Sequence, residues 1–184
     1  MRTAPVALAD CDNLTAVAKS AAAISALTHP HRDAQDACVL WSVATALGVT
    51  GSPSLRESMT IALSYLEPES EARWRSIVAE AEECDLSHLV PNGWVVRALQ
   101  AAWRAAVEVE HADPTLAYAD GVRFAISLGD DTDTIAAIAG GLLGAHFGAS
   151  TIPLSWRTNL AGWPEGYGND ELSALAVTLA KGAL

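Results

Sequence analysis

Three carboxylates crowd the start of one predicted helix, in the sequence Gly129-Asp130-Asp131-Thr132-Asp133-Thr134. A helix N-terminus favours negative charge because its free N–H groups and its dipole are positive, but capping needs only one acid. Asp131 and Thr134 share one face of the first turn, and Asp133 reaches the same side. Carboxylate and hydroxyl oxygens suit Mg²⁺, Mn²⁺ or Ca²⁺ rather than zinc. The spacing alone is compatible both with a divalent-metal site and with a solvated, over-capped helix start.

The helix that follows these acids is rich in small residues. Gly140, Gly141 and Gly144 lie inside it, and each glycine in a helix interior costs about 1 kcal/mol relative to alanine. A helix that accepts this cost is predicted to pack closely against its neighbours and to be central and buried. An acid cluster at the end of a central helix indicates function more strongly than one on a surface helix.

Helix start and stop signals recur along the whole chain and predict an all-α fold. Helices are expected over residues 13–27, 31–48, 54–66, 69–82, 94–109, 113–128, 130–148 and 169–182. In the first of them, the apolar face is predicted to consist of Leu14, Val17, Ala21, Ile24 and Leu27. No strand-like alternation competes, and no linker is long enough to divide the chain. One all-helical domain over residues 1–184 is therefore expected.

Composition excludes several classes of protein. The chain has 184 residues, of which 51% are hydrophobic, and this excludes intrinsic disorder. A net charge of −11 argues against a nucleic-acid polymer or an anionic membrane surface as partner. Three separated cysteines without a CxxC pair predict neither a disulfide framework nor a zinc site. With no signal-peptide pattern and no apolar run long enough to span a membrane, the expected location is the cytoplasm.

Several motifs of the chain resemble those of one known family, the ADP-ribosylglycohydrolases. The family's C-terminal signature reads Gly-Gly-Asp-Thr-Asp-Thr, then a small-residue helix, then Ile-Pro and Trp. It is similar to the run from Gly129 to Gly148 with Ile152-Pro153 and Trp156. Three further segments resemble the family: Met1-Arg2-x-x-Pro5, Thr28-His29 and Asn92-Gly93-Trp94-Val95-Val96. The resemblance covers nearly the whole chain.

The resemblance implies a compact multi-helix bundle that holds two Mg²⁺ or Mn²⁺ ions and cleaves the glycosidic bond of ADP-ribose conjugates. Asp131, Asp133 and Thr134 match the family's metal ligands, and the two acids are the expected catalytic residues. His29, Gly93 and Trp94 match positions close to the bound ADP-ribose. The expected partners are therefore ADP-ribose or an ADP-ribosylated protein. By its own sequence context, without the resemblance, His29 is better explained as a turn residue beside Pro30 than as a functional one.

Two departures from the family pattern bear on function. Asp130 stands where the signature has its second glycine, which adds a charge beside the expected metal ligands. The family also has an N-terminal half, with Gly-Asp-x-x-Gly and Thr-Asp-Asp-Thr motifs that supply further ligands, and this chain has no counterpart of those helices. The chain is therefore expected to be a fragment, a misplaced start, one half of a split enzyme or a degenerate homologue. A bundle without these helices would leave apolar surface exposed, and this predicts a partner chain, self-association or a rearranged core.

Three functions remain open from the sequence. The first is a truncated or split metal-dependent hydrolase in which this chain leaves one ion incompletely liganded. The second is a non-catalytic module that binds ADP-ribose or metal without turnover. The third is a purely structural role.

Overall fold

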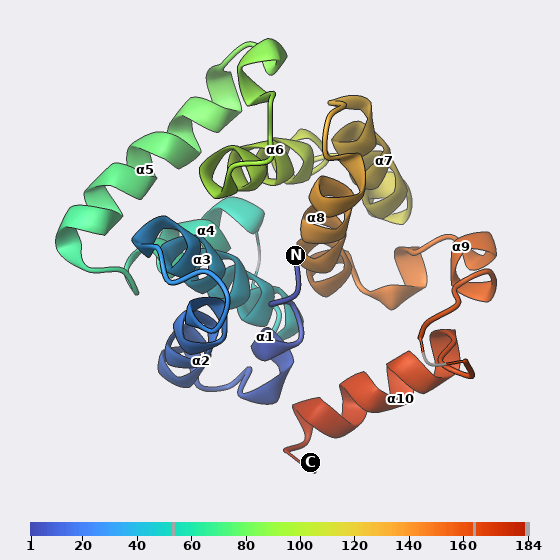
Figure 1. Ribbon diagram of the computed structural model, residues 1–184. Helices are drawn as coiled ribbons and strands as arrows, with labels where there is room; N and C mark the ends of the chain where they lie inside the picture. Colours follow the sequence, from blue (N-terminus) through green and yellow to red (C-terminus); the bar gives the residue numbers. More distant parts are fainter. Residues whose placement is uncertain (53, 164, 183–184) are drawn as a thin grey trace.

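The computed structural model describes residues 1–52, 54–163 and 165–182, and every regular element in these ranges is helical (Figure 1). The all-α prediction is therefore confirmed. The longer helices are α2 (Leu14–Ala26), α3 (Arg32–Val49), α4 (Leu55–Leu63), α5 (Pro68–Glu83), α6 (Val95–Glu108), α7 (Pro114–Ser127), α8 (Thr132–Phe147) and α10 (Asn169–Ala180). The short turns α1 (Val6–Ala9), η1 (Leu86–Leu89), η2 (Ala149–Thr151) and α9 (Leu154–Thr158) are not predicted by the sequence pattern. Within the described ranges, no helix combines the length and apolar character needed to cross a membrane.

Side-chain caps fix where several helices begin. The Asn13 side chain accepts a hydrogen bond from the Ala16 N–H at 3.1 Å at the start of α2. At the start of α4, the Ser54 hydroxyl accepts the Glu57 N–H at 3.0 Å. Such caps satisfy N–H groups that have no partner inside the helix. The predicted starts of α2 and α4 lie within one residue of the observed ones for this reason.

The glycine-rich helix α8 lies at the centre of the fold, with α3, α6 and α7 packed around it (Figure 1). Its glycines face neighbouring groups at close range. A Cβ atom on Gly140 would lie 3.3 Å from the Tyr118 hydroxyl, and one on Gly141 would lie 3.2 Å from the Ala4 Cβ. A Cβ on Gly144 would lie 3.5 Å from the Tyr118 ring. The central position and close packing predicted for this helix are confirmed, but its burial is only partial, because Gly140, Gly141 and Gly144 are half-buried.

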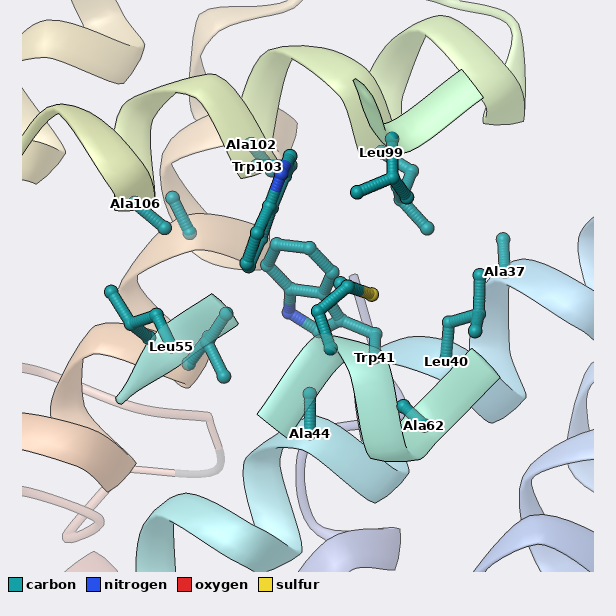
Figure 2. Close-up of a cluster of buried hydrophobic side chains, with 14 of the residues drawn as sticks. Ala37, Leu40, Trp41, Ala44, Leu55, Ala62, Leu99, Ala102, Trp103 and Ala106 are labelled. Carbon is teal, nitrogen blue, oxygen red and sulfur yellow. The ribbon is translucent and has the colours of Figure 1, made fainter. Parts of the chain in front are cut away.

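The main core fills the space between α3, α4 and α6 (Figure 2). Large side chains alternate there with alanines, and the small alanine side chains let the helix backbones approach one another. The large members shown in Figure 2 are Leu40, Trp41, Leu55, Leu99 and Trp103, and the alanines are Ala37, Ala44, Ala62, Ala102 and Ala106. The alanine-rich composition is thus the means by which these helices pack.

The last turn of α2 differs from the prediction. Ile24 and Leu27 are 45% and 81% exposed, whereas Ser25 is buried. After Ala21, helical spacing allows either residue 24 or residue 25 to continue the buried face. Packing selects Ser25, whose hydroxyl donates to the His29 carbonyl at 3.4 Å.

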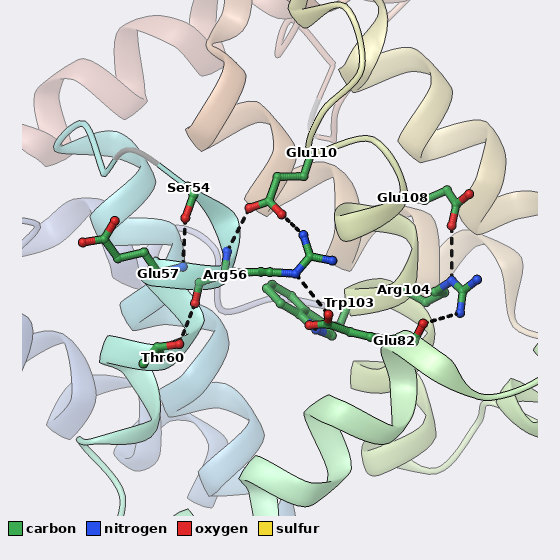
Figure 3. A network of polar contacts seen from close by, with 9 residues as sticks. All are labelled: Ser54, Arg56, Glu57, Thr60, Glu82, Trp103, Arg104, Glu108 and Glu110. Carbon is green, nitrogen blue, oxygen red and sulfur yellow. Dashed lines mark hydrogen bonds and ion pairs between the residues drawn. The ribbon is translucent and has the colours of Figure 1, made fainter.

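A polar network joins α4, α5 and α6 beside this core (Figure 3). The Arg56 guanidinium donates to the Glu82 carboxylate at 3.0 Å and also pairs with Glu110. The other Glu82 oxygen accepts the Trp103 indole N–H at 2.9 Å. The Glu110 side chain is only 4% exposed, and it also accepts the Arg56 backbone N–H at 3.0 Å. The network therefore ties three helices together through hydrogen-bonded charges, of which Glu110 is buried while the Arg56 and Glu82 side chains are 44% and 26% exposed.

The C-terminal part of the chain lies at the edge of the molecule, where α9 stands apart from the central helices and α10 runs back toward α1 (Figure 1). No residue of α10 is buried. Leu172, Leu175 and Val177 of this helix are exposed, and Trp163 before it is 92% exposed. The structure thus has the exposed apolar surface that was expected, while its coverage by another chain stays a prediction.

Replacing Gly121 by valine is expected to destabilise the fold by about 1–3 kcal/mol through overpacking. A Cβ at Gly121 would lie 2.6 Å from Leu143 Cδ1, 3.1 Å from Val109 Cγ2 and 3.3 Å from the Ala105 carbonyl oxygen. Urea unfolding followed by circular dichroism measures the effect. Gly93→Ala is the matched control, because no atom lies within 4 Å of a Cβ at that position. Equal stability of the two variants would contradict this account of the α7–α8 contact.

Candidate functional site

The acid cluster stands on an unusual turn at the N-terminus of α8. Gly129 and Asp130 both have left-handed backbone conformations, with φ angles of 82° and 60°. Asp131 occupies the N-cap position, yet its side chain accepts no capping hydrogen bond. Left-handed backbone is unfavourable for residues other than glycine, although Asn and Asp tolerate it best. The turn therefore holds Asp131 in a position that ordinary capping does not require.

Asp113 at the start of α7 shows what an ordinary capping acid does in this protein. Its carboxylate accepts the N–H and the hydroxyl of Thr115 at 2.9 and 2.8 Å. These two bonds, the backbone one foremost, lower the pKa of Asp113 below its usual value. Asp131 has the same side chain at the equivalent position and makes neither kind of bond. The over-capping explanation of the cluster therefore does not describe Asp131.

The oxygens of the three candidate ligands are not engaged by other side chains of the described residues. Asp133 is exposed, and Asp131 and Thr134 are half-buried. Two carboxylates and one hydroxyl form a donor set that fits Mg²⁺ or Mn²⁺, and they would fill about half of the six positions around Mg²⁺. In residues 1–52, 54–163 and 165–182, no group of three or more His, Cys, Asp or Glu side chains is placed to hold a metal. The remaining ligands of an ion here would be water, substrate or another segment.

Asn92 holds the turn that carries these acids. Its side-chain N–H donates to the Gly129 carbonyl at 3.2 Å, and its side-chain oxygen accepts the Asp131 N–H at 3.0 Å. Its own backbone N–H donates to the Asp130 carboxylate at 2.7 Å. Asn92 is fully buried. The sequence identifies this residue only as part of a family-like segment and gives no indication of its contacts 37 to 39 residues away.

The backbone at Asp130 explains the departure from the Gly-Gly-Asp-Thr-Asp-Thr pattern. With a φ of 60°, this position suits glycine, and aspartate is among the residues that replace it most readily. The Asp130 carboxylate turns to the backbone N–H of Asn92. Its charge is therefore used at least in part to hold the turn.

An apolar pocket of about 60 Å³ lies one helical turn along α8 from Asp133 and Thr134, and none of the acids lines it. It is bounded by the early turns of α3, α6 and α8, and its lining is Met1, Thr3, Ala4, Ala37, Cys38, Trp41, Val95, Ala98, Leu99, Ala137 and Ile138. Ala137 and Ile138 follow Asp133 and Thr134 by one helical turn and so lie on the same faces of α8. Val95 directly follows Trp94. The pocket wall therefore includes the residue after Trp94 and the turn of α8 that follows the acids, but not the acids or Trp94 themselves.

Helices α3 and α8 run in the same direction, which brings their N-termini to one end of the molecule. The Trp41 indole N–H donates to the Ile138 carbonyl at 2.9 Å. Two turns further along, a Cβ on Gly48 would lie 3.2 Å from the His146 nitrogen. Both contacts follow the same order along the two helices, so the N-termini of α3 and α8 are neighbours. The turn that contains His29 leads into α3, and the acid cluster leads into α8.

The predicted ligand-binding residues differ in how closely the structure links them to the acid turn. Gly93 and Trp94 follow Asn92 directly, so they lie next to the acid turn; Trp94 is 54% exposed. Exposed His29 lies before α3, where its ring nitrogen Nδ1 is 2.8 Å from the Thr28 hydroxyl. Among the described residues, no hydrogen bond or ion pair joins His29 to the acids. The ligand-binding roles of all three residues stay predictions.

Comparison with known proteins identifies similar sequences. The family model described as ADP-ribosylglycohydrolase matches residues 1–183. The chain is 28% identical over 164 residues to ADP-ribosylarginine hydrolase Tri1 of Pseudomonas putida (strain GB-1), which covers 88% of this chain and 41% of that protein. It is 48% identical over 42 residues to human ADP-ribosylhydrolase ARH3, which covers 23% of this chain and 12% of that protein. The chain thus matches less than half of the length of either relative.

Proposed function

The chain belongs to the ADP-ribosylglycohydrolase family, and from this premise we propose that it supplies part of a divalent-metal site for hydrolysis of ADP-ribose conjugates. The observation that carries the proposal is that the Asp131 carboxylate makes no capping hydrogen bond. This residue occupies an N-cap position without capping, beside Asp133 and Thr134. An acid held away from the bonds it would ordinarily make is available to a cation.

The residues around the acids support a ligand site of mixed character. The pocket one helical turn away is apolar, and Trp94, which precedes the lining residue Val95, is exposed. The space around Gly93 is open, so a ligand can approach the backbone there. Sites for small organic ligands commonly combine apolar walls with a few convergent polar groups.

In the proposed reaction, Asp131, Asp133 and Thr134 hold Mg²⁺ or Mn²⁺ by their side-chain oxygens. The chemistry such an ion supplies is positive charge that orients ribose hydroxyls and the attacking water. His29 and the Gly93–Trp94 segment bind the ADP-ribose moiety and keep its anomeric carbon near that water. The bond from the anomeric carbon to the acceptor then breaks through an oxocarbenium-like transition state while the water oxygen bonds to that carbon, and the proton that the water loses passes to the departing acceptor.

We propose ADP-ribosylated arginine as the first substrate to test. Tri1 is named an ADP-ribosylarginine hydrolase, and its similarity extends over 88% of this chain. The alternative is a module that binds ADP-ribose and metal without turnover. The number of metal ligands in this chain supports that alternative. Two carboxylates and one hydroxyl leave about half of the Mg²⁺ coordination shell to other ligands, so the metal site of this chain alone is incomplete.

One experiment separates these functions. The chain is titrated calorimetrically with Mn²⁺ and then with ADP-ribose, and the same preparation is incubated with ADP-ribosylarginine while released ADP-ribose is measured by chromatography. Metal-dependent release supports the hydrolase, and binding without release supports the non-catalytic module. Absence of both metal and ADP-ribose binding would refute both proposals and favour a structural role.

A further inference from the structure

The Asn92 side chain bridges two main-chain groups on either side of a left-handed residue. Its amide N–H donates to the Gly129 carbonyl, and its amide oxygen accepts the Asp131 N–H. One side chain must therefore provide a donor and an acceptor at once. Among side chains of this size only asparagine does so in a fixed plane, because aspartate lacks the donor and leucine lacks both.

These bonds act on the backbone that directs the candidate ligands. The left-handed pair Gly129–Asp130 reverses the chain just before α8, and Asp130 is the one non-glycine residue with positive φ in the described ranges. The Asn92 backbone N–H holds the Asp130 carboxylate as well. Because Asn92 is fully buried, water does not compete freely for these three bonds.

We propose that Asn92 is a positioning residue for the metal site, an inference that rests on the proposed function. The Asn92 side chain accepts a hydrogen bond from the Asp131 N–H from outside the helix. Asn92 therefore fixes the backbone of the N-cap residue, and the Asp131 carboxylate takes no part in this bond. The carboxylates of Asp131 and Asp133 are then held ready for a cation. Groups that orient metal ligands in this way typically influence metal affinity by about 10- to 100-fold when they are replaced.

The test compares Asn92→Leu with a matched control in the same chain. Gln100 is also a buried amide: it donates to the Ile77 carbonyl at 3.0 Å and to Glu80 at 2.9 Å, and it accepts from Arg97 at 2.9 Å. Gln100→Leu removes the same kinds of bond on α6, away from the acid turn. Mn²⁺ binding is measured by electron paramagnetic resonance of the free ion, and hydrogen exchange of the Asp131 amide is measured by NMR.

Asn92→Leu is expected to weaken Mn²⁺ binding by about 10- to 100-fold and to speed exchange of the Asp131 amide, whereas Gln100→Leu changes neither. If Asn92→Leu does not fold, Asn92→Ser replaces it, because the shorter side chain cannot reach both backbone groups. Equal Mn²⁺ affinity of the Asn92 variant and the wild type would overturn the role of Asn92 alone. A wild-type chain that bound no Mn²⁺ would overturn the proposed function and this role with it, whatever the amide exchange showed.

Discussion

Asp131→Asn combined with Asp133→Asn is expected to weaken Mn²⁺ binding on the order of 100-fold or more, because affinity for hard cations depends on the number of charged oxygen ligands. The fold is expected to stay as stable as the wild type or to become slightly more stable. Neither carboxylate makes a hydrogen bond or ion pair with another described side chain, and Asp131 does not cap α8. The substitution breaks no bond, and the repulsion between neighbouring acids that it relieves offsets the attraction to the positive helix N-terminus that it removes. Calorimetric titration with Mn²⁺ and urea unfolding measure the two quantities.

Asp113→Ala provides the opposite pattern as a control. The Asp113 carboxylate caps α7 through the N–H and the hydroxyl of Thr115. Its loss is expected to lower the urea midpoint and to leave Mn²⁺ affinity unchanged. Because Thr115 lowers the pKa of Asp113, the stabilisation is present above the carboxyl group's ordinary pKa and is lost as the pH falls through the lowered value. The metal assignment would fail if the double variant lost stability like Asp113→Ala while it kept its Mn²⁺ affinity.

Trp103→Ala is expected to have the largest effect on stability, about 3–5 kcal/mol. The Trp103 side chain is 1% exposed and fills the space between α4 and α6 (Figures 2 and 3). Its indole N–H also donates to Glu82, the carboxylate that receives Arg56. Truncation therefore creates a cavity and removes one bond of the polar network. Urea unfolding followed by circular dichroism at several temperatures measures the loss.

Two further tryptophan variants separate packing from hydrogen bonding. Trp103→Phe keeps most of the ring volume and loses the indole N–H, so it is expected to cost about 1.5–3 kcal/mol for a bond to a charged acceptor plus a smaller packing term. Trp163→Ala is expected to leave stability unchanged, because that side chain is 92% exposed. A similar loss in Trp103→Ala and Trp163→Ala would show that the core between α4 and α6 is not packed as described.

Much of the fold could be predicted from the sequence because its helices begin at residues with local signals. Asn13, Ser54 and Asp113 each accept a backbone N–H a few residues ahead, and such bonds depend on nearby sequence alone. The short helix α1 has too few residues for a periodic pattern to appear. The error at Ile24 arose where helical spacing allowed two continuations and tertiary packing selected the less apolar one.

The candidate site was only partly predictable. The acids are contiguous in the sequence, and their placement at the start of the small-residue helix follows from capping and composition. The link between Asn92 and the acid turn could not be predicted, because it joins groups 37 to 39 residues apart. Pro91-Asn92-Gly93 by itself indicates only a turn. The conformation of Asp130 likewise depends on a tertiary contact that no local pattern encodes.

The two side-chain bonds of Asn92 reach main-chain atoms, those of Gly129 and Asp131, rather than the side chain at either position. The shape of the turn is therefore largely independent of what residue 131 carries. In protein engineering, the metal-binding side chain at position 131 can therefore be changed while the backbone of the turn is kept. Histidine or cysteine at this position would be held by the same backbone. Because imidazole and thiolate favour softer ions than carboxylate does, such exchanges offer a route to altered metal selectivity without redesign of the fold.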